Sequence, residues 1–322
     1  MSGLNKQGDI ARAIESVVSS FSGQLGIAAT NLETGEEVAW NADQLLPIAS
    51  VLKVPVLLEV LQQAEEGRIS LDEPIAPMAT HRTFGSGVLK ELSNEVRMSV
   101  HDLAILMIVL SDNTATNALI ALVGGVAAVN ARMQRLGFPS ITLHSNIPLP
   151  HPIEPGQPMP KVRNVAEARP VELANLFAGI ARDRVASREV CEGMLAILRR
   201  QQFVDQVPRY FEYDSIGREL GLVQRVGVAC KTGFHPGTRC DAGLVTLGSE
   251  TGQGPRFAYA VLNTGSTDTS MSAEAEGAVA NARIGRLLLE HWWPPELGRA
   301  PLRDLPSWVS AGRSDPAGSM LQ

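Results

Sequence analysis

The sequence predicts an α/β fold of the α+β type, in which an antiparallel five-stranded sheet is flanked by helices and carries an inserted all-α lobe. Three observations support this prediction. Two strand-like runs near the N-terminus are joined at Glu33-Thr34-Gly35, which is typical of a hairpin. From Pro47 to about Ile197 the apolar residues recur almost wholly at helical spacing. Three further strand-like runs lie between residues 222 and 264, so we expect all five strands in one sheet.

Local patterns predict the individual helices. The stretch "DIARAIESVVSSF" has its apolar residues on one side of a helix and an Asp at its start. In "SVHDLAILMIVL", Ser99 stands three residues before Asp102, as in a capping box, and the run is apolar nearly all round, which predicts a buried helix. "VAAVNARMQRLG" stops at Gly137, where a left-handed C-cap is favourable. A last amphipathic helix covers about residues 272–291.

The order of these elements predicts a discontinuous organisation. Residues 1–46 and 200–293 are expected to form an α/β lobe, and residues 47–199 a helical lobe. Residues 294–322 are rich in Pro, Gly, Ser and Arg, which predicts a loosely attached, flexible tail. Six prolines between residues 148 and 160 predict an extended loop rather than a helix. Small-molecule sites usually lie in clefts between such lobes.

Composition excludes several classes of function. The 322-residue chain has a formal net charge of -6 and no cluster of Lys and Arg, which argues against a nucleic-acid partner. No apolar run approaches the roughly 18 residues that a membrane span needs. The six histidines show no ligand spacing, so we expect no metal and no cofactor. The expected partner is a small-molecule substrate, and the oligomeric state stays open.

Cysteine content and the N-terminus bear on the cellular compartment. Three cysteines in a chain of this length do not indicate a set of structural disulfides. Cys230 and Cys240 flank a short connection and could meet across a hairpin, although reduced, buried thiols are the favoured interpretation. The N-terminus lacks the features of a signal peptide, so a cytoplasmic location is expected for the chain as given. A periplasmic or secreted location is expected instead if a leader was removed.

Three short motifs carry the chemistry. In "PIASVLKVP", Ser50 and Lys53 are three residues apart and share one face of a helix that we expect to begin at Ser50. By itself this spacing is expected about once by chance in a chain this long. Ser111-Asp112-Asn113 at the end of the buried helix and Lys231-Thr232-Gly233 at the end of a strand are far rarer. All three together, in this order, are strong evidence for a common site.

At these residues the chain resembles the class A β-lactamases and the related penicillin-binding serine acyltransferases, whose signatures are S-x-x-K, S-D-N and K-T-G. The segments "ASVLKVPVLLEVL", "GSGVL", "LMIVLSDNTATNALIALVGG" and "ACKTGFHPGTRCDAGLV" extend the likeness over most of residues 20–291. The resemblance implies a β-lactamase/transpeptidase-like fold. The C-terminal tail lies outside it.

Residue chemistry agrees with the resemblance for acylation. A serine hydroxyl needs a base within hydrogen-bond reach, and a half-buried lysine with a lowered pKa can be that base. We therefore expect Ser50 to be the nucleophile and Lys53 its base, with the Ser50 N–H at a helix start near the developing oxyanion. The resemblance implies that the Phe234 N–H is the second oxyanion donor.

The resemblance also implies the remaining roles. Ser111 would pass a proton to the leaving nitrogen, and Asn113 would bind the acylamide side chain of the substrate. A purely structural alternative for Ser111-Asp112-Asn113 is a helix stop followed by an N-cap for the next helix, and both interpretations can hold. Lys231 would bind the substrate carboxylate with Thr232 and Gly233, and as a catalytic residue it would help Ser111 to protonate the leaving nitrogen. Arg239 would assist there, or it is a solvated arginine at a strand end.

Deacylation is the least determined step. Class A enzymes hold the hydrolytic water on a loop Glu, usually within a Glu-x-x-Asn pattern. Glu154 followed by Pro155 lies about as far before Pro170 as expected, but Gln157 replaces the asparagine. A solvated loop carboxylate is the alternative for Glu154, and Glu167 is the fallback base. Without a working base the acyl-enzyme would persist.

We therefore expect a serine β-lactamase that hydrolyses the β-lactam amide through a Ser50 acyl-enzyme. One alternative is a D,D-peptidase or esterase-like serine hydrolase of the same fold. Another is a non-catalytic sensor that binds penicillin.

Overall fold

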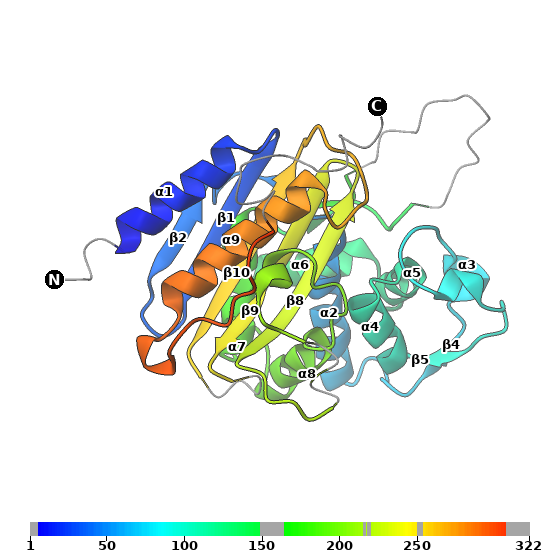
Figure 1. Cartoon of the computed structure of the whole chain (residues 1–322). Coiled ribbons are helices and arrows are strands. Elements are labelled where there is room, and N and C mark those ends of the chain that lie inside the picture. Colours follow the sequence, from blue (N-terminus) through cyan, green and yellow to red (C-terminus); the bar gives the residue numbers. More distant parts are fainter. Residues whose placement is uncertain (1–5, 149–163, 215–216, 218–219, 250–253, 307–322) are drawn as a thin grey trace.

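The computed structural model describes residues 6–148, 164–214, 217, 220–249 and 254–306, and its architecture is shown in Figure 1. The sequence stretch with six prolines falls almost entirely on residues 149–163, so that prediction lies outside the described residues. Within the described ranges no single helix has the length and apolar character to cross a membrane. Helices α5 (Asn113–Leu122) and α6 (Val126–Arg135) reach that threshold only as a pair bent by 74°.

The centre of the molecule is a five-stranded sheet, as predicted. Its strand order is β2-β1-β10-β9-β8, and every neighbouring pair is antiparallel. The strands are β1 (Gln24–Asn31), β2 (Glu37–Trp40), β8 (Val226–His235), β9 (Thr238–Leu247) and β10 (Arg256–Thr264). The first hairpin therefore joins the last three strands in one sheet, and β8, which carries Lys231-Thr232-Gly233, is an edge strand.

Helices cover both faces of this sheet (Figure 1). Helices α1 (Lys6–Ser19) and α9 (Glu276–Trp292) pack on one face, and α7 (Pro170–Ala181) packs on the other. Successive strand residues point to opposite faces, so Leu244 and Val245 of β9 belong to different hydrophobic cores. The wholly buried strand interiors follow from this two-sided cover.

The remaining helices pack against one another and share one hydrophobic core with α7 and its face of the sheet. They are α2 (Lys53–Glu65), α3 (Met78–His81), α4 (Val100–Val109), α5, α6 and α8 (Arg188–Leu198). Helix α4 begins at the predicted cap, where the Ser99 hydroxyl accepts a hydrogen bond from the Asp102 N–H at 3.0 Å. Gly137, with φ of 84°, stands just past the end of α6, as its sequence predicted.

One boundary near the proposed nucleophile differs from the prediction. Residues Ala49–Leu52 form a 3₁₀ turn, and the α-helix begins at Lys53 instead of at Ser50. Such a tight first turn is common at helix starts. Pro55 then falls in the first turn of α2, where its missing N–H removes no helical hydrogen bond.

Small sheets that the sequence analysis missed tie the loops together. Strand β7 (Ala166–Ala168) pairs with β3 (Leu46–Pro47) on one side and with β6 (Thr142–Leu143) on the other. A further pair joins β4 (Pro74–Ile75) to β5 (Met98–Ser99). Strand β3 ends two residues before the 3₁₀ turn, so this pairing helps to place the segment that carries Ser50.

Part of the segment predicted to be a flexible tail is packed. The 3₁₀ turn Pro295–Leu297 is followed by a bridge between Leu302 and Phe211, and the Arg303 N–H donates to the Tyr210 carbonyl at 2.9 Å. Residues 307–322 lie outside the described residues. The division into two lobes and a tail stays a prediction.

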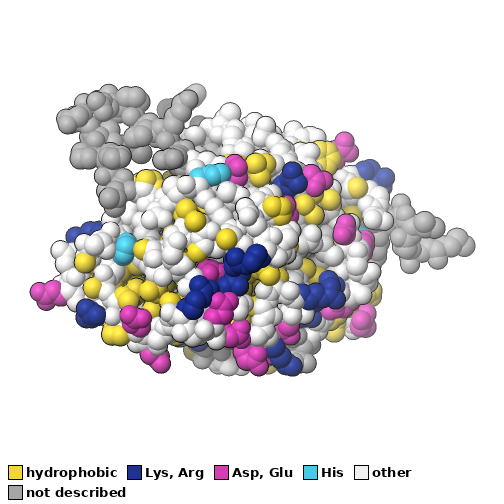
Figure 2. Space-filling view, turned by 180° about the vertical axis from the view of Figure 1, so that it is seen from behind, with side chains coloured by type: hydrophobic (Ala, Val, Ile, Leu, Met, Phe, Trp, Pro, Cys, Tyr) yellow, Lys and Arg dark blue, Asp and Glu magenta, His cyan; other side chains and the backbone are white. Residues whose placement is uncertain are grey.

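Figure 2 shows acidic and basic side chains interspersed over the described part of the face opposite to that of Figure 1. All three cysteines are free and buried. Cys230 belongs to the core under α1 and α9, whereas Cys240 belongs to the core on the helical side. The two thiols therefore lie on opposite faces of the sheet, which excludes the hairpin disulfide.

Candidate active site

The segment that carries Ser50 is held in a strained conformation. Ala49 has a φ of 44°, which is uncommon for a residue with a Cβ atom. The strain is maintained from both sides, because the Ile48 N–H donates to the Ala166 carbonyl at 3.1 Å and the Cys240 thiol contacts the Pro47 carbonyl at 3.2 Å. Strain of this kind persists only where the surroundings impose it, and it clusters at functional sites.

Lys53 links the first two motifs. Its side chain is completely buried, and Nζ lies 3.0 Å from Ser50 Oγ and 2.9 Å from Ser111 Oγ. Nζ also lies 2.7 Å from the Ser111 carbonyl oxygen and 2.8 Å from Asn113 Oδ1. The lysine is thus surrounded by four neutral oxygens, two of which belong to hydroxyls that can exchange a proton with it.

The environment favours the neutral form of this lysine. Burial lowers the pKa of Lys53 well below its usual value, and the neighbouring positive charge of Lys231 lowers it further. The carboxylate of Asp112 acts in the opposite direction but more weakly. Lys53 can therefore serve as a base, as its position three residues after a serine predicted.

Ser111-Asp112-Asn113 forms the bend between α4 and α5. Ser111 has a φ of 54°, and Asp112 is the N-cap of α5, where Oδ1 accepts from the Ala115 N–H at 2.9 Å. The other carboxylate oxygen accepts from the N–H groups of Val88 and Leu89 at 2.7 and 2.9 Å. The structural role considered for this motif is thus confirmed, and the same turn aims Ser111 and Asn113 at Lys53.

The third motif meets the first along the edge of the sheet. A Cβ atom on Gly233 would lie 2.7 Å from the Ser50 backbone nitrogen and 2.8 Å from the Ile48 carbonyl oxygen, so only glycine allows this approach. Lys231 is completely buried, its Nζ donates to the Thr232 carbonyl at 2.7 Å, and burial lowers its pKa to about 8. The buried Thr232 hydroxyl has no hydrogen-bond partner among the described residues.

Comparison with known proteins agrees with this geometry. The sequence profile of the β-lactamase enzyme family matches residues 9–292. The chain belongs to the β-lactamase enzyme family. The resemblance seen in the three motifs is therefore confirmed over most of the chain.

Curated relatives of this family member include β-lactamases of enteric bacteria. Beta-lactamase CTX-M-97 of Escherichia coli is 27% identical over 172 residues, which are 53% of this chain and 58% of the relative. Beta-lactamase CTX-M-4 of Salmonella typhimurium is 28% identical with the same coverage. The chain thus spans less than two thirds of the length of the curated relatives it matches.

Solved structures match over a larger part of the chain. A β-lactamase from Sphaerobacter thermophilus superposes with a TM-score of 0.73 and 28% identity, covering 88% of this chain and 96% of that one. A β-lactamase from Chitinophaga pinensis has a TM-score of 0.71 and 25% identity, with coverages of 87% and 98%. The structure of PBP-A, at 24% identity and a TM-score of 0.70, supports the fold alone. The predicted fold class is confirmed.

Two further predicted residues lie close to the third motif, Phe234 in β8 and Arg239 in β9. Arg239 is almost completely buried, and its guanidinium donates to the carbonyls of His235, Thr238 and Ser270 at 3.0, 2.8 and 2.7 Å. The alternative of a solvated arginine is therefore wrong. Phe234 is half-buried and makes an edge-to-face contact with Phe203, with ring centroids 6.3 Å apart.

Sequence reasoning missed a polar network on the side of the sheet that α9 covers. Asp241 is fully buried and directly opposite Thr232 in the β8–β9 register. It accepts hydrogen bonds from the Val207 N–H at 3.0 Å and the Tyr259 hydroxyl at 3.1 Å, and burial raises its pKa to about 8. Gln206 Nε2 donates to the Gly233 carbonyl at 3.3 Å. The detectable signal was an Asp directly before the small and apolar run at residues 242–245 of the predicted strand.

Of the two candidates for the deacylation base, Glu167 belongs to the described residues. Glu154 lies outside the described residues. Glu167 lies in β7, where Oε1 is 3.3 Å from His144 Nε2 and Oε2 accepts from Asn164 Nδ2 at 3.3 Å. In the part of the chain that the structure describes, no group of three or more His, Cys, Asp or Glu side chains could hold a metal ion.

Proposed function

We propose that the protein is a serine β-lactamase, which hydrolyses the amide bond of a β-lactam through an acyl-enzyme on Ser50. The observation that carries this proposal is the buried Lys53 amine, which lies within 3.0 Å of the Ser50 hydroxyl and 2.9 Å of the Ser111 hydroxyl. Membership of the β-lactamase enzyme family supports a hydrolase that acts on β-lactams.

In the proposed acylation step, neutral Lys53 takes the proton of Ser50 as Oγ attacks the lactam carbonyl carbon. The lowered pKa of Lys53 makes this neutral form accessible. The developing oxyanion accepts hydrogen bonds from the N–H groups of Ser50 and Phe234. The carbon–nitrogen bond then breaks, and the proton passes from Lys53 through the Ser111 hydroxyl to the leaving nitrogen.

Polar groups around this centre would orient the substrate. Lys231 supplies a cation for the substrate carboxylate, with Arg239 as a second positive charge close to the same strand. The Thr232 hydroxyl, which is buried and has no hydrogen-bond partner among the described atoms, would be a further donor to that carboxylate. Gly233 allows the strand to approach Ser50, and Asn113 supplies an amide to the acylamide side chain.

Deacylation is proposed to use a water molecule activated by Glu154. The Glu-Pro sequence and the distance in sequence to Pro170 support this role. The carboxylate removes a proton from water as the water oxygen attacks the ester carbonyl carbon. The bond from that carbon to Ser50 Oγ then breaks, and the carboxylic acid gives the same proton back to Ser50, so that Glu154 and Lys53 end in their starting states. Replacing Glu154 by Gln should trap the acyl-enzyme, whereas undiminished turnover would remove this residue from the mechanism.

The decisive experiment is steady-state turnover of a chromogenic cephalosporin, with Ser50→Ala as the control. Many turnovers per protein molecule, abolished in the control, are expected. A single stoichiometric burst would instead indicate a penicillin-binding sensor. Hydrolysis of a D-Ala-D-Ala peptide in the absence of cephalosporin turnover would indicate a D,D-peptidase.

Intact-mass measurement separates the nucleophile from the rest of the mechanism. Incubation with a penicillin should add one ligand mass, and peptide mapping should place it on Ser50. A protein that stays unmodified under conditions where it is folded would refute the assignment of the nucleophile.

A further inference from the structure

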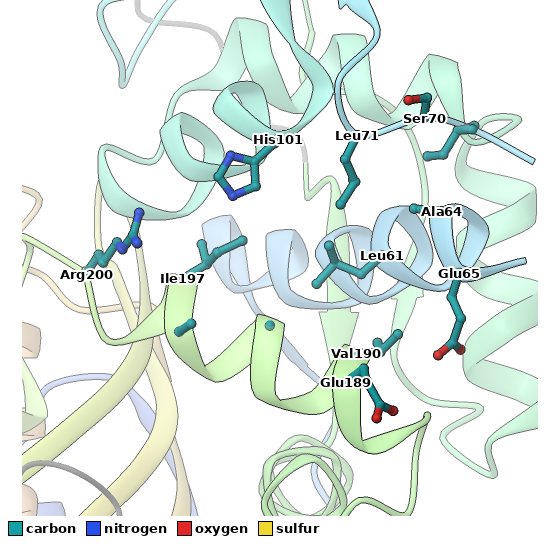
Figure 3. Close-up of a pocket in the computed structure, with 13 residues that line it drawn as sticks. Leu61, Ala64, Glu65, Ser70, Leu71, His101, Glu189, Val190, Ile197 and Arg200 are labelled. Carbon is teal, nitrogen blue, oxygen red and sulfur yellow. The ribbon is translucent and has the colours of Figure 1, made fainter. Parts of the chain in front are cut away.

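A concave site lies at the far end of α2 from Ser50. It is a groove of about 660 Å³ between the last turns of α2, helix α8 and residues 69–71 (Figure 3). A volume of this size is typical of sites that hold small molecules. The groove is built from positions that share one face of each helix, which in α8 include Glu189, Gly193, Ala196 and Ile197. Arg200, which also lines it, follows two residues after the end of α8.

The middle of the groove is apolar and its floor is lined by small residues. Leu61 and Ile197 face each other across it with Leu71 above them, as Figure 3 shows. Gly193 has no side chain and Ala196 has only a methyl group, which leaves the groove open along α8. An extended chain with small or aliphatic side chains could therefore lie against this floor.

The two ends of the groove carry opposite charges. Arg200 and His101 lie at one end, and Glu65 and Glu189 lie at the other (Figure 3). Glu65 already accepts hydrogen bonds from Ser187 and Gln62. Glu189 and Arg200 make no side-chain hydrogen bond or ion pair within the described ranges. An anion is thus favoured at Arg200 and a cation at Glu189.

The spacing of these charges limits the length of the ligand. Glu189 and Leu198 are nine residues apart in α8, which corresponds to about 14 Å along the helix axis, and Arg200 stands two residues further on. An extended chain spans about 3.3 to 3.6 Å per residue. Allowing for the reach of the Arg and Glu side chains toward the ligand, about four residues fit between the two charges.

We infer that this groove binds a short peptide of about four small or aliphatic residues with both ends free. Its C-terminal carboxylate pairs with Arg200, the residue best suited to bind a carboxylate through two parallel hydrogen bonds. Its N-terminal ammonium pairs with Glu189, and its side chains cover Leu61 and Ile197. The site is separate from Ser50 and binds its ligand without bond cleavage.

The test uses the tetrapeptide Ala-Ala-Leu-Ala and the full chain with labelled Ile, Leu and Val methyl groups. Titration should shift the methyl signals of Leu61, Leu71 and Ile197 in one saturable process. Ala196→Phe, a change at an exposed position, should fill the groove and abolish these shifts, while the remaining signals stay those of the folded protein. Absence of shifts up to about 10 mM peptide would overturn the inference.

Capped peptides test the two charge contacts separately. Amidation of the C-terminus should weaken binding to the parent protein by about two- to fivefold, the range of exposed ion pairs, and should have no effect on Arg200→Ala. N-terminal acetylation should behave in the same way toward Glu189→Gln. Arg135→Ala and Glu95→Gln, which change exposed charges outside the groove, serve as matched controls. Equal sensitivity of the two groove variants and the two controls to capping would refute the proposed orientation.

Discussion

A methyl group on residue 233 would collide with the segment that carries the proposed nucleophile. The added Cβ atom would lie 2.7 Å from the Ser50 nitrogen, 2.8 Å from the Ile48 oxygen and 3.0 Å from the Ala49 Cβ. None of these atoms belongs to a flexible side chain. The strand and the 3₁₀ turn must therefore separate by about 0.7 Å before the closest pair reaches the lower limit of ordinary van der Waals contact.

This displacement acts directly on the reacting atoms. Ser50 Oγ stands 3.0 Å from Lys53 Nζ, and Lys53 is anchored independently by Ser111 and Asn113. Misplacement of reacting groups by about 1 Å can lower a rate about a hundredfold. A shift of about 0.7 Å in Gly233→Ala should then slow acylation by roughly ten- to fiftyfold.

The assay is the second-order rate of acylation by a penicillin, followed by intact mass over time. Gly193→Ala is the matched control, because its added Cβ would meet only the Leu61 Cδ1 atom at 3.7 Å. The control should acylate at the parental rate. A folded Gly233→Ala protein that acylates within about twofold of the parent would refute the argument that this close approach positions Ser50.

Three further predictions concern buried ionisable groups. Burial lowers the pKa of Lys231 from 10.5 to about 8, which corresponds to a penalty of about 3 kcal/mol on the charged form. Lys231→Met should therefore raise the Tm by a few degrees while the rate of acylation falls. An unchanged or lower Tm would contradict this. The folded-state pKa of Asp241 is raised from 3.8 to about 8, so the stability it contributes is present at low pH and is lost as the pH rises toward 8, by at most about 1.4 kcal/mol per pH unit. Asp241→Asn should flatten the free energy of unfolding measured in urea between pH 5 and 8, and an equally steep variant would argue against a buried carboxylate as the source. Because the cysteines are free, a reductant should leave the Tm unchanged. The denatured, unreduced protein should react with a thiol reagent at Cys191, Cys230 and Cys240. Fewer than three reactive thiols would contradict the fold described.

The long elements were predictable because their residue patterns extend over many positions. The five strands of the main sheet have four to ten residues each, and helices such as α4 carry their own capping signals. Strands β3, β6 and β7 have only two or three residues, too few for any periodicity. Their pairing depends on tertiary contacts, so it could not be inferred from local sequence.

The candidate site shows the same limit. Ser50, Lys53, Ser111 and Asn113 were predicted together because they belong to short motifs whose combined occurrence in one chain is rare by chance. The 3₁₀ start of α2 was missed because helix boundaries carry little sequence information. Asp241 was missed because its partners, Val207 and Tyr259, come from distant segments that meet only in the fold.

The contacts of Lys53 explain how a buried lysine can be neutral and so accept a proton as a base. A carboxylate partner would stabilise the charged amine and raise its pKa. Instead the Lys53 amine faces two hydroxyls, one carbonyl and one amide oxygen, which satisfy its hydrogen-bonding groups without adding a negative charge. The acid that raises its pKa, Asp112, accepts hydrogen bonds from the N–H groups of Val88 and Leu89 and from the Ala115 N–H at the start of α5. The turn at residues 111–113 thus brings neutral oxygens to the lysine and directs its own carboxylate to backbone donors, which leaves burial as the dominant influence on the pKa of Lys53.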